Sequence, residues 1–211
     1  ENHRLHWGLP QWVAFLRDKD IPIMPRSKEQ IEALDGDAVS PKELAQIVMQ
    51  DPFLALRLLR RAERHRSQTL GHDTTTILGA VQQVGLRGMR YAAADSPLCD
   101  DANLGLQGCE ERAVLSASIA LHWAAHRADV SPEEAALAAL LGEMGELMLW
   151  AFFPELPQRA LEELKSGRAT RNVQAQQHSL IKSLLSGDRP LIFGAILAGA
   201  LMLAAVLYWS G

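Results

Sequence analysis

The sequence predicts an all-α fold, with a helical domain in residues 1–165, a linker with a short helix in residues 166–189, and one transmembrane helix in residues 190–209. Three observations support this prediction. Helix-capping sequences recur through the first part of the chain. No segment alternates apolar and polar residues with the period of two that a half-buried strand shows. The end of the chain carries a long apolar run without a charged side chain.

Composition agrees with a globular helical domain. Of the 211 residues, 48% are hydrophobic and only 6% are aromatic, and Ala and Leu are frequent, which favours helices over a β-sandwich. The formal net charge of −4 gives the whole chain no attraction to nucleic acid or acidic lipid, so any basic surface must be local. The two cysteines, Cys99 and Cys109, match no disulfide framework or zinc ligand set, and we expect reduced thiols.

Three helix starts carry strong capping signals. Ser40-Pro41-Lys42-Glu43 places a cap, a proline at the first helical position and a glutamate at the third, and apolar residues follow at helical spacing. Asp51-Pro52 repeats this pattern before a helix expected over residues 53–64, where Asp51 should accept backbone N–H bonds. Ser131-Pro132-Glu133-Glu134 repeats it again before an Ala/Leu-rich helix that should end near Leu141.

The remaining elements of the domain have weaker signals. Ser27, with Gln30 three residues later, predicts a helix that ends near Asp35-Gly36. Residues 96–108 (SPLCDDANLGLQG) have the composition of a loop. A further helix is expected from Leu156 to Lys165, before Gly167.

The C-terminal run from Leu191 to Trp209 predicts a membrane span. Its nineteen residues include no charged side chain and would extend roughly 28 Å as a helix, close to the thickness of a bilayer core. Lys182 and Arg189 precede the run, so the positive-inside rule places the helical domain in the cytoplasm. A buried core helix of the globular domain is the alternative.

Small residues within this run favour close packing of helices. Ala195 and Gly199, four residues apart and next to Gly194, form the small-xxx-small pattern of membrane helices that approach each other closely. The run could therefore also pack into a larger membrane complex.

Between residues 21 and 161 the chain resembles the HDOD family, helical relatives of the HD metal-dependent phosphohydrolases. The resemblance rests most firmly on residues 43–52 (ELAQIVMQDP), which are similar to the family's helix, aspartate-proline turn, helix signature. Weaker matches occur in the expected order in residues 21–25 (IPIMP), 84–90 (VGLRGMR) and 138–147 (AALLGEMGEL). The resemblance implies a multi-helix HD-like bundle.

The departures from this resemblance imply that the catalytic metal centre is absent. Catalytic HD proteins hold a divalent metal with a histidine on one helix and a histidine-aspartate pair on a later one. Here Leu115 and Gly142-Glu143 stand in those places, and neither leucine nor glycine can donate to a metal. Glu63 replaces an asparagine common in the family. We therefore expect no catalytic residue, no metal and no cofactor.

Three other groups of residues have competing interpretations. His122 and His126 share a helix face and could bind a metal, although partly exposed histidines explain them as well. Glu143 and Glu146 could act as paired carboxylates or as first-turn acids that complement a helix dipole. Residues 85–88 (GLRG) could cradle a phosphate, but a turn between helices is the simpler interpretation.

Arg57, Arg60, Arg61 and Arg64 form a basic stripe at positions i, i+3, i+4 and i+7. The stripe is either a solvated helix face or a contact surface for anionic lipid or an acidic partner. Nucleic acid is a weaker candidate, because no interleaved aromatic residues or reader motif accompany the arginines.

These features together predict a non-catalytic signalling or scaffold module that binds partner proteins, membrane proteins among them, and is anchored to a membrane by residues 190–209. The resemblance to the HDOD family implies that this is the inner membrane of a bacterium. The interaction candidates are Asp51, Pro52, Arg57, Arg60, Arg61, Arg64, Gly194, Ala195 and Gly199. Two alternatives stay open: a structural accessory subunit of a membrane complex, and a degenerate HD-type phosphohydrolase acting on nucleotides.

Overall fold

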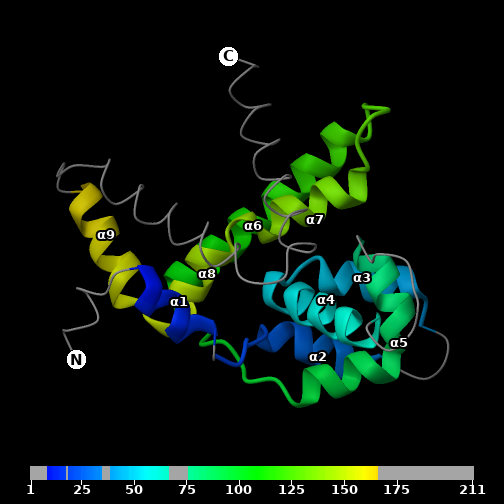
Figure 1. The fold of residues 1–211 in the computed structure, drawn as a ribbon, viewed down its shortest axis with the longest axis horizontal. Helices are drawn as coiled ribbons and strands as arrows, with labels where there is room; N and C mark the ends of the chain where they lie inside the picture. The colour runs from blue at the N-terminus through cyan, green and yellow to red at the C-terminus, as the bar shows by residue number, and fades with distance from the viewer. Residues whose placement is uncertain (1–8, 18, 35–38, 67–75, 166–211) are drawn as a thin grey trace.

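The computed structural model describes residues 9–17, 19–34, 39–66 and 76–165, and these residues form helices with no strand (Figure 1). The prediction of an all-α domain is therefore confirmed for this part of the chain. The predicted linker and membrane span lie outside the described residues. The helices are α1 (Leu9–Arg17), α2 (Pro25–Ala33), α3 (Pro41–Val48), α4 (Pro52–Arg66), α5 (Ile77–Ala94), α6 (Leu104–Ala124), α7 (Pro132–Gly142), α8 (Met144–Phe152) and α9 (Glu155–Lys165).

The helices gather in two groups (Figure 1). Helices α2 to α5 pack on one another in the first group, while α6, α7, α8 and α9 form the second, with α6 and α7 lying along each other as a hairpin. Helix α4 contacts both α6 and α7, so it joins the groups. Helix α1 belongs to the second group, because the ring of Trp12 lies 5.1 Å from that of Phe153, centroid to centroid.

The capped helix starts follow the sequence prediction. Ser40 and Glu43 form a reciprocal capping box at the start of α3, with the Glu43 N–H donating to Ser40 Oγ at 3.2 Å. Ser131 caps α7 through the Glu134 N–H. Each cap provides an acceptor for an N–H group that the first turn of a helix leaves unpaired.

One predicted helix start and the end of one predicted loop were wrong. Helix α2 begins at Pro25 rather than at Ser27. Ser27 lies in the first turn of the helix, and its side chain is buried in the domain. Helix α6 begins at Leu104, so the predicted loop of residues 96–108 ends five residues early. The reason lies in Asn103, whose Oδ1 accepts from the Leu106 N–H at 3.0 Å while its Nδ2 donates to the Trp150 carbonyl at 2.9 Å.

A buried carboxylate, Asp51, holds the starts of two helices together. Its Oδ1 accepts from the N–H groups of Phe53 at 2.9 Å and Leu54 at 3.0 Å, which is the cap that the Asp51-Pro52 sequence predicts. Its Oδ2 accepts from the Met24 N–H at 2.8 Å, directly before α2. Asp51 is completely buried, and burial raises the pKa of its carboxyl while the three N–H donors oppose that rise. One side chain therefore fixes α4 and α2 relative to each other.

The segment before α2 is also tied to the second group of helices. The Ile23 N–H donates to the Pro97 carbonyl, and the Cys99 N–H donates to the Ile23 carbonyl, both at 2.9 Å. Arg26 in α2 pairs with Glu110 in α6 and donates to the Gln50 carbonyl at 3.1 Å. Burial raises the pKa of Glu110 to about 7, against the effect of Arg26. The start of α2 therefore contacts the turn before α4, the segment before α6, and α6 itself.

The most apolar segment of the described residues lies in the core. Among them, the stretch Pro132–Phe152 alone is long and apolar enough to cross a membrane by length and composition, and 67% of its most apolar window is buried in the domain. It comprises α7 and α8, separated at Glu143. Gly105 allows α6 to pack tightly here, because a Cβ at this position would meet the Trp150 ring at 2.2 Å. This stretch has the burial of a core element.

Replacing Asp51 with alanine should lower the free energy of unfolding by about 2–4 kcal/mol, because three N–H groups lose their acceptor in a buried place. Urea unfolding of the full chain in mild detergent measures this change. Ser40→Ala is the matched control, since it removes a cap at an exposed helix start and should cost about 1 kcal/mol or less. Equal costs for the two variants would contradict the role of Asp51 as the junction between α2 and α4.

Candidate functional site

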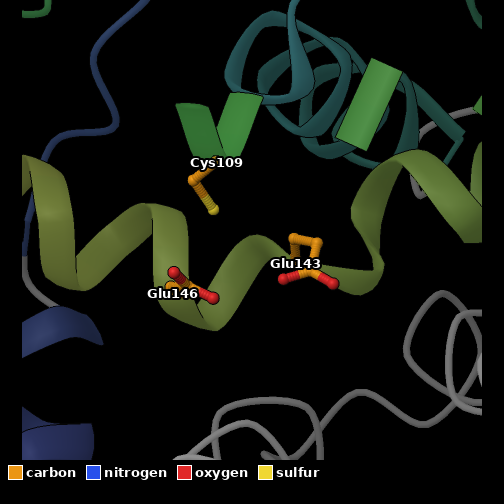
Figure 2. A group of neighbouring side chains, drawn as sticks. All are labelled: Cys109, Glu143 and Glu146. Atoms are coloured by element: carbon orange, nitrogen blue, oxygen red, sulfur yellow. The ribbon is translucent and has the colours of Figure 1, made fainter. Parts of the chain in front are cut away.

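A cluster of three potential metal ligands lies where α6 faces the junction of α7 and α8. The Cys109 thiol points from α6 toward Glu143 and Glu146 (Figure 2). One ligand atom from each residue lies within 4.8 Å of the others. Such a set of one sulfur and two carboxylate oxygens is chemically compatible with a zinc-like cation.

The break between α7 and α8 positions the two carboxylates. Helix α7 ends at Gly142, and Glu143 is both its C-cap and the residue that precedes α8. The Leu147 N–H donates to the Glu143 carbonyl at 3.0 Å, so Glu143 is included in the first turn of α8. Glu146 follows three residues later and therefore lies on the same face.

A cationic side chain already occupies this cluster. Arg112, one turn after Cys109 on α6, places Nη2 3.0 Å from Glu146 Oε2 and 3.7 Å from Glu143 Oε2. Trp150 Nε1 also donates to Glu146 Oε1 at 3.2 Å. Arg112 is thus the positive partner of both carboxylates, and Glu146 has Trp150 as a second donor.

The ion pairs of Arg112 disfavour a metal ion at this cluster. Burial raises the pKa of the Cys109 thiol well above its usual range, so this residue is a thiol rather than a thiolate at neutral pH. Burial, and next the neighbouring Glu146, raises the pKa of Glu143, while Arg112 opposes this rise. A divalent cation would have to deprotonate the thiol and displace the Arg112 guanidinium. The residues therefore fit an ion-pair cluster better than a metal centre.

The sequence analysis identified only part of this cluster. It paired Glu143 with Glu146, but it placed Leu115 as the α6 residue that belongs to the same centre. Leu115 is 61% exposed, and the α6 side chains beside Glu143 are Cys109 and Arg112. The i, i+3 spacing of Cys109 and Arg112 put them on one helix face, but nothing local indicated which element that face meets.

The two histidines are remote from the cluster. His122 and His126 are both exposed near the end of α6, and His122 is thirteen residues, or about 20 Å of helix, beyond Cys109. The His122 Nδ1 atom lies 2.8 Å from the Ser118 carbonyl oxygen of the preceding turn. This placement matches the interpretation of partly exposed histidines.

The glycine-containing segment 85–88 lies inside α5. Gly85 has a φ of 68°, which glycine adopts readily, and this residue breaks the helical geometry at the middle of α5. A Cβ at Gly88 would meet the Val84 side chain at 2.6 Å and would also approach Arg61 of α4. Gly88 therefore leaves room for the Val84 side chain one turn earlier in α5, and it lies beside Arg61 of α4.

The arginine stripe of α4 divides into two parts. Arg57 pairs with Asp20 at 2.6 Å and donates to the Ile21 carbonyl at 2.5 Å, which makes it a structural contact. Arg60 and Arg64 are exposed, and the guanidinium of Arg61 lies over the Tyr91 ring of α5, 5.0 Å from its centroid. Pro52 is buried at the start of the same helix.

An exposed apolar face runs along α6, which the sequence analysis missed. Leu115, Ile119 and Trp123 recur at positions i, i+4 and i+8, with 61%, 44% and 50% of their surfaces exposed. The opposite side of α6 is buried through small side chains, Ala113, Ala117, Ala120 and Ala124. Because α6 is apolar on both sides, its periodicity gave no signal of which side faces solvent.

An open hollow of about 250 Å³ lies near the start of α6. Its lining includes Cys99, Pro22 and Phe152. Burial raises the pKa of the Cys99 thiol to about 12, so this cysteine is protonated at neutral pH. The hollow therefore carries no reactive thiolate.

Comparison with known proteins extends this description. The HDOD domain family model matches residues 21–184. The response regulator MmoQ from Methylococcus capsulatus has a similar structure, with a TM-score of 0.61 and 24% identity over 87% of this chain and 73% of that one. A virulence factor from Campylobacter jejuni is also similar, with a TM-score of 0.65 and 13% identity over 89% of this chain and 73% of that one. No curated protein matches the chain.

The structural likenesses, at these identities, show a shared fold. The family match covers most of the 211 residues and includes the aspartate-proline turn at Asp51-Pro52. The chain belongs to the HDOD domain family.

Proposed function

We propose that this chain is a non-catalytic signalling module that binds partner proteins and is tethered to a membrane by residues 190–209. Its family and the response regulator among its structural neighbours favour a signalling role. The exposed apolar face of α6 is the observation that carries the binding function. The Arg112 ion pairs support the absence of catalysis.

The argument against catalysis concerns charge. Phosphohydrolysis of the HD type needs a divalent metal to activate water and to neutralise the charge that develops on phosphate. In this chain the Arg112 guanidinium supplies the positive charge between Glu143 and Glu146, and a guanidinium cannot ionise a bound water. The cluster then stabilises the contact between α6 and α8 instead of performing chemistry.

The argument for partner binding concerns the α6 face defined by Leu115, Ile119 and Trp123. Three large apolar side chains at successive helical turns form a stripe of the kind that packs against another helix. Tryptophan is among the residues that contribute most to binding energy at protein interfaces, and Trp123 lies at one end of this stripe. An amphipathic helix of a partner protein is the occupant that fits this geometry.

The membrane tether rests on the sequence of Leu191–Trp209, which lies outside the described residues. Nineteen uncharged residues bordered by Arg189 and Tyr208-Trp209 have the length and flanks of a single span. In the proposed arrangement the helical domain faces the cytoplasm of a bacterial cell, where both cysteines stay reduced.

Purified protein should hold no stoichiometric Mn²⁺, Mg²⁺ or Zn²⁺, because Arg112 already neutralises the acidic pair. Elemental analysis and phosphodiesterase assays with a cyclic dinucleotide in added Mn²⁺ should both be blank. Glu133→Gln, an exposed acid on α7, is the control for Glu143→Gln. Bound metal together with turnover that only Glu143→Gln abolishes would overturn the non-catalytic assignment.

Replacing Ile119 and Trp123 with serine should release the partner without unfolding the domain, because both side chains are exposed. The full chain is purified in mild detergent, and co-purifying proteins are quantified by mass spectrometry. Leu161→Ser, which changes an exposed leucine of α9, should retain them. A partner retained by the double α6 variant, with helicity unchanged, would exclude this face as the binding surface.

Truncation after Asp188 should move the domain from the membrane fraction into the soluble fraction with its helicity retained. The reason is that the nineteen-residue apolar run supplies the membrane affinity. Fractionation and circular dichroism measure the two properties. A full chain that stays soluble and monomeric without detergent would show that the run is not an anchor.

A further inference from the structure

We propose that the arginine–tyrosine surface, formed by Arg60, Arg61 and Arg64 of α4 with Tyr91 of α5, binds an acidic segment of a partner protein through its carboxylates. This inference deepens the proposed partner-binding function and rests on it. The arginine–tyrosine surface would be a second contact with a partner protein, separate from the apolar face of α6, and it would bind carboxylates.

The surface has a fixed centre. The Arg61 guanidinium lies over the Tyr91 ring, 5.0 Å from its centroid, and Arg61 Nε is buried with no hydrogen-bond partner among the described residues. Gly88 of α5 lies beside the same side chain, since a Cβ at that position would be 3.8 Å from Nε, an ordinary van der Waals distance. Tyr91 itself is 63% exposed. A partner would therefore meet an aromatic ring and a guanidinium that are already oriented, which reduces the entropy lost on binding.

Two further guanidinium groups border this centre. Arg60 and Arg64 are exposed and one turn apart, and Arg64 Nε donates to the Arg60 carbonyl at 3.4 Å. Arg60 loses part of its hydration to neighbouring groups although its side chain reaches solvent, and this loss, followed by repulsion from Arg64 and from Arg57, lowers its pKa. Like charges held close together in this way favour an anionic ligand, which relieves their repulsion. Arg57 is not part of the surface, because its guanidinium pairs with Asp20 and donates to the Ile21 carbonyl.

Charge and chemistry favour an acidic protein segment over other anions. Helix α4 contains five arginines and one acid, Glu63, in a chain whose net charge is −4. Such a small basic surface suits a short acidic segment, while a nucleic acid or a charged leaflet calls for a wider basic face. Arginine also binds carboxylates with two parallel hydrogen bonds, and Arg and Tyr are enriched at protein interfaces.

A fluorescein-labelled octaglutamate peptide is the probe, and fluorescence anisotropy with the full chain in nonionic detergent is the measurement. We expect saturable binding that added salt weakens. Arg60→Ala with Arg64→Ala should weaken it at least about tenfold, and Tyr91→Ala should weaken it less. The control variant Lys28→Ala with Lys42→Ala also removes two positive charges, one from α2 and one from α3. It should change the affinity by less than about twofold.

Equal affinity of the two double variants, or no binding by the wild type, would overturn the proposal. So would tighter binding of a twenty-nucleotide single strand, or of micelles containing phosphatidylserine, at the same arginines, because either would identify another occupant. The proposed partner binding by α6 is tested by a different experiment. It would be contradicted if the double Ile119 and Trp123 variant retained its co-purifying protein. The two experiments therefore distinguish a failure of this surface from a failure of partner binding.

Discussion

The fold depends on one buried carboxylate at the meeting point of two helices. Asp51 accepts N–H bonds at the start of α4 and from Met24 before α2, and nothing of its side chain reaches solvent. A buried charge is expensive unless it is fully hydrogen-bonded, and three donors meet that condition here. Because the Ile23 backbone next to it also pairs with Pro97 and Cys99, the same junction orients the segment that leads into α6. The proline after Asp51 suits this place, since a first helical position needs no N–H donor.

The second group of helices has a polar centre where α6 faces the junction of α7 and α8. Here Arg112 lies between Glu143 and Glu146, so the electrostatic requirement of the paired acids is met by a side chain. The Arg112 ion pairs and the glycine at position 142 both support the proposed absence of catalysis. This absence leaves the outer side of α6, rather than an internal site, as the place where function is expected.

The sequence predicted local features well and tertiary partners poorly. The caps at Ser40, Asp51 and Ser131 depend on residues within three positions, and each of them forms as expected. Asn103 was missed because its second bond goes to Trp150, forty-seven residues away. The Arg57 pair with Asp20 could not be predicted either, and it removed one member of an apparently uniform basic stripe.

For the candidate sites, too, the sequence predicted local spacing but not the residues that meet in the folded chain. Glu143 and Glu146 were paired correctly by helical spacing, but Arg112 and Cys109 reach them only through the packing of α6 on α7 and α8. The apolar stripe on α6 was hidden because both sides of that helix are apolar, and only the packed structure distinguishes them. Side-chain periodicity identifies a helix face, whereas the identity of the neighbouring helix depends on long-range contacts.

Hydrogen exchange in an Asp51→Asn variant tests the role of this junction most directly. Asparagine keeps the shape of aspartate but has one acceptor oxygen, so it can serve either Met24 or the Phe53–Leu54 pair. Amide exchange should therefore accelerate at least about tenfold at one of these two places, while the amides of α7 around Leu140 keep their protection. Unchanged protection at both places, or an equal acceleration throughout the domain, would contradict the assignment of Asp51 as the link between α2 and α4.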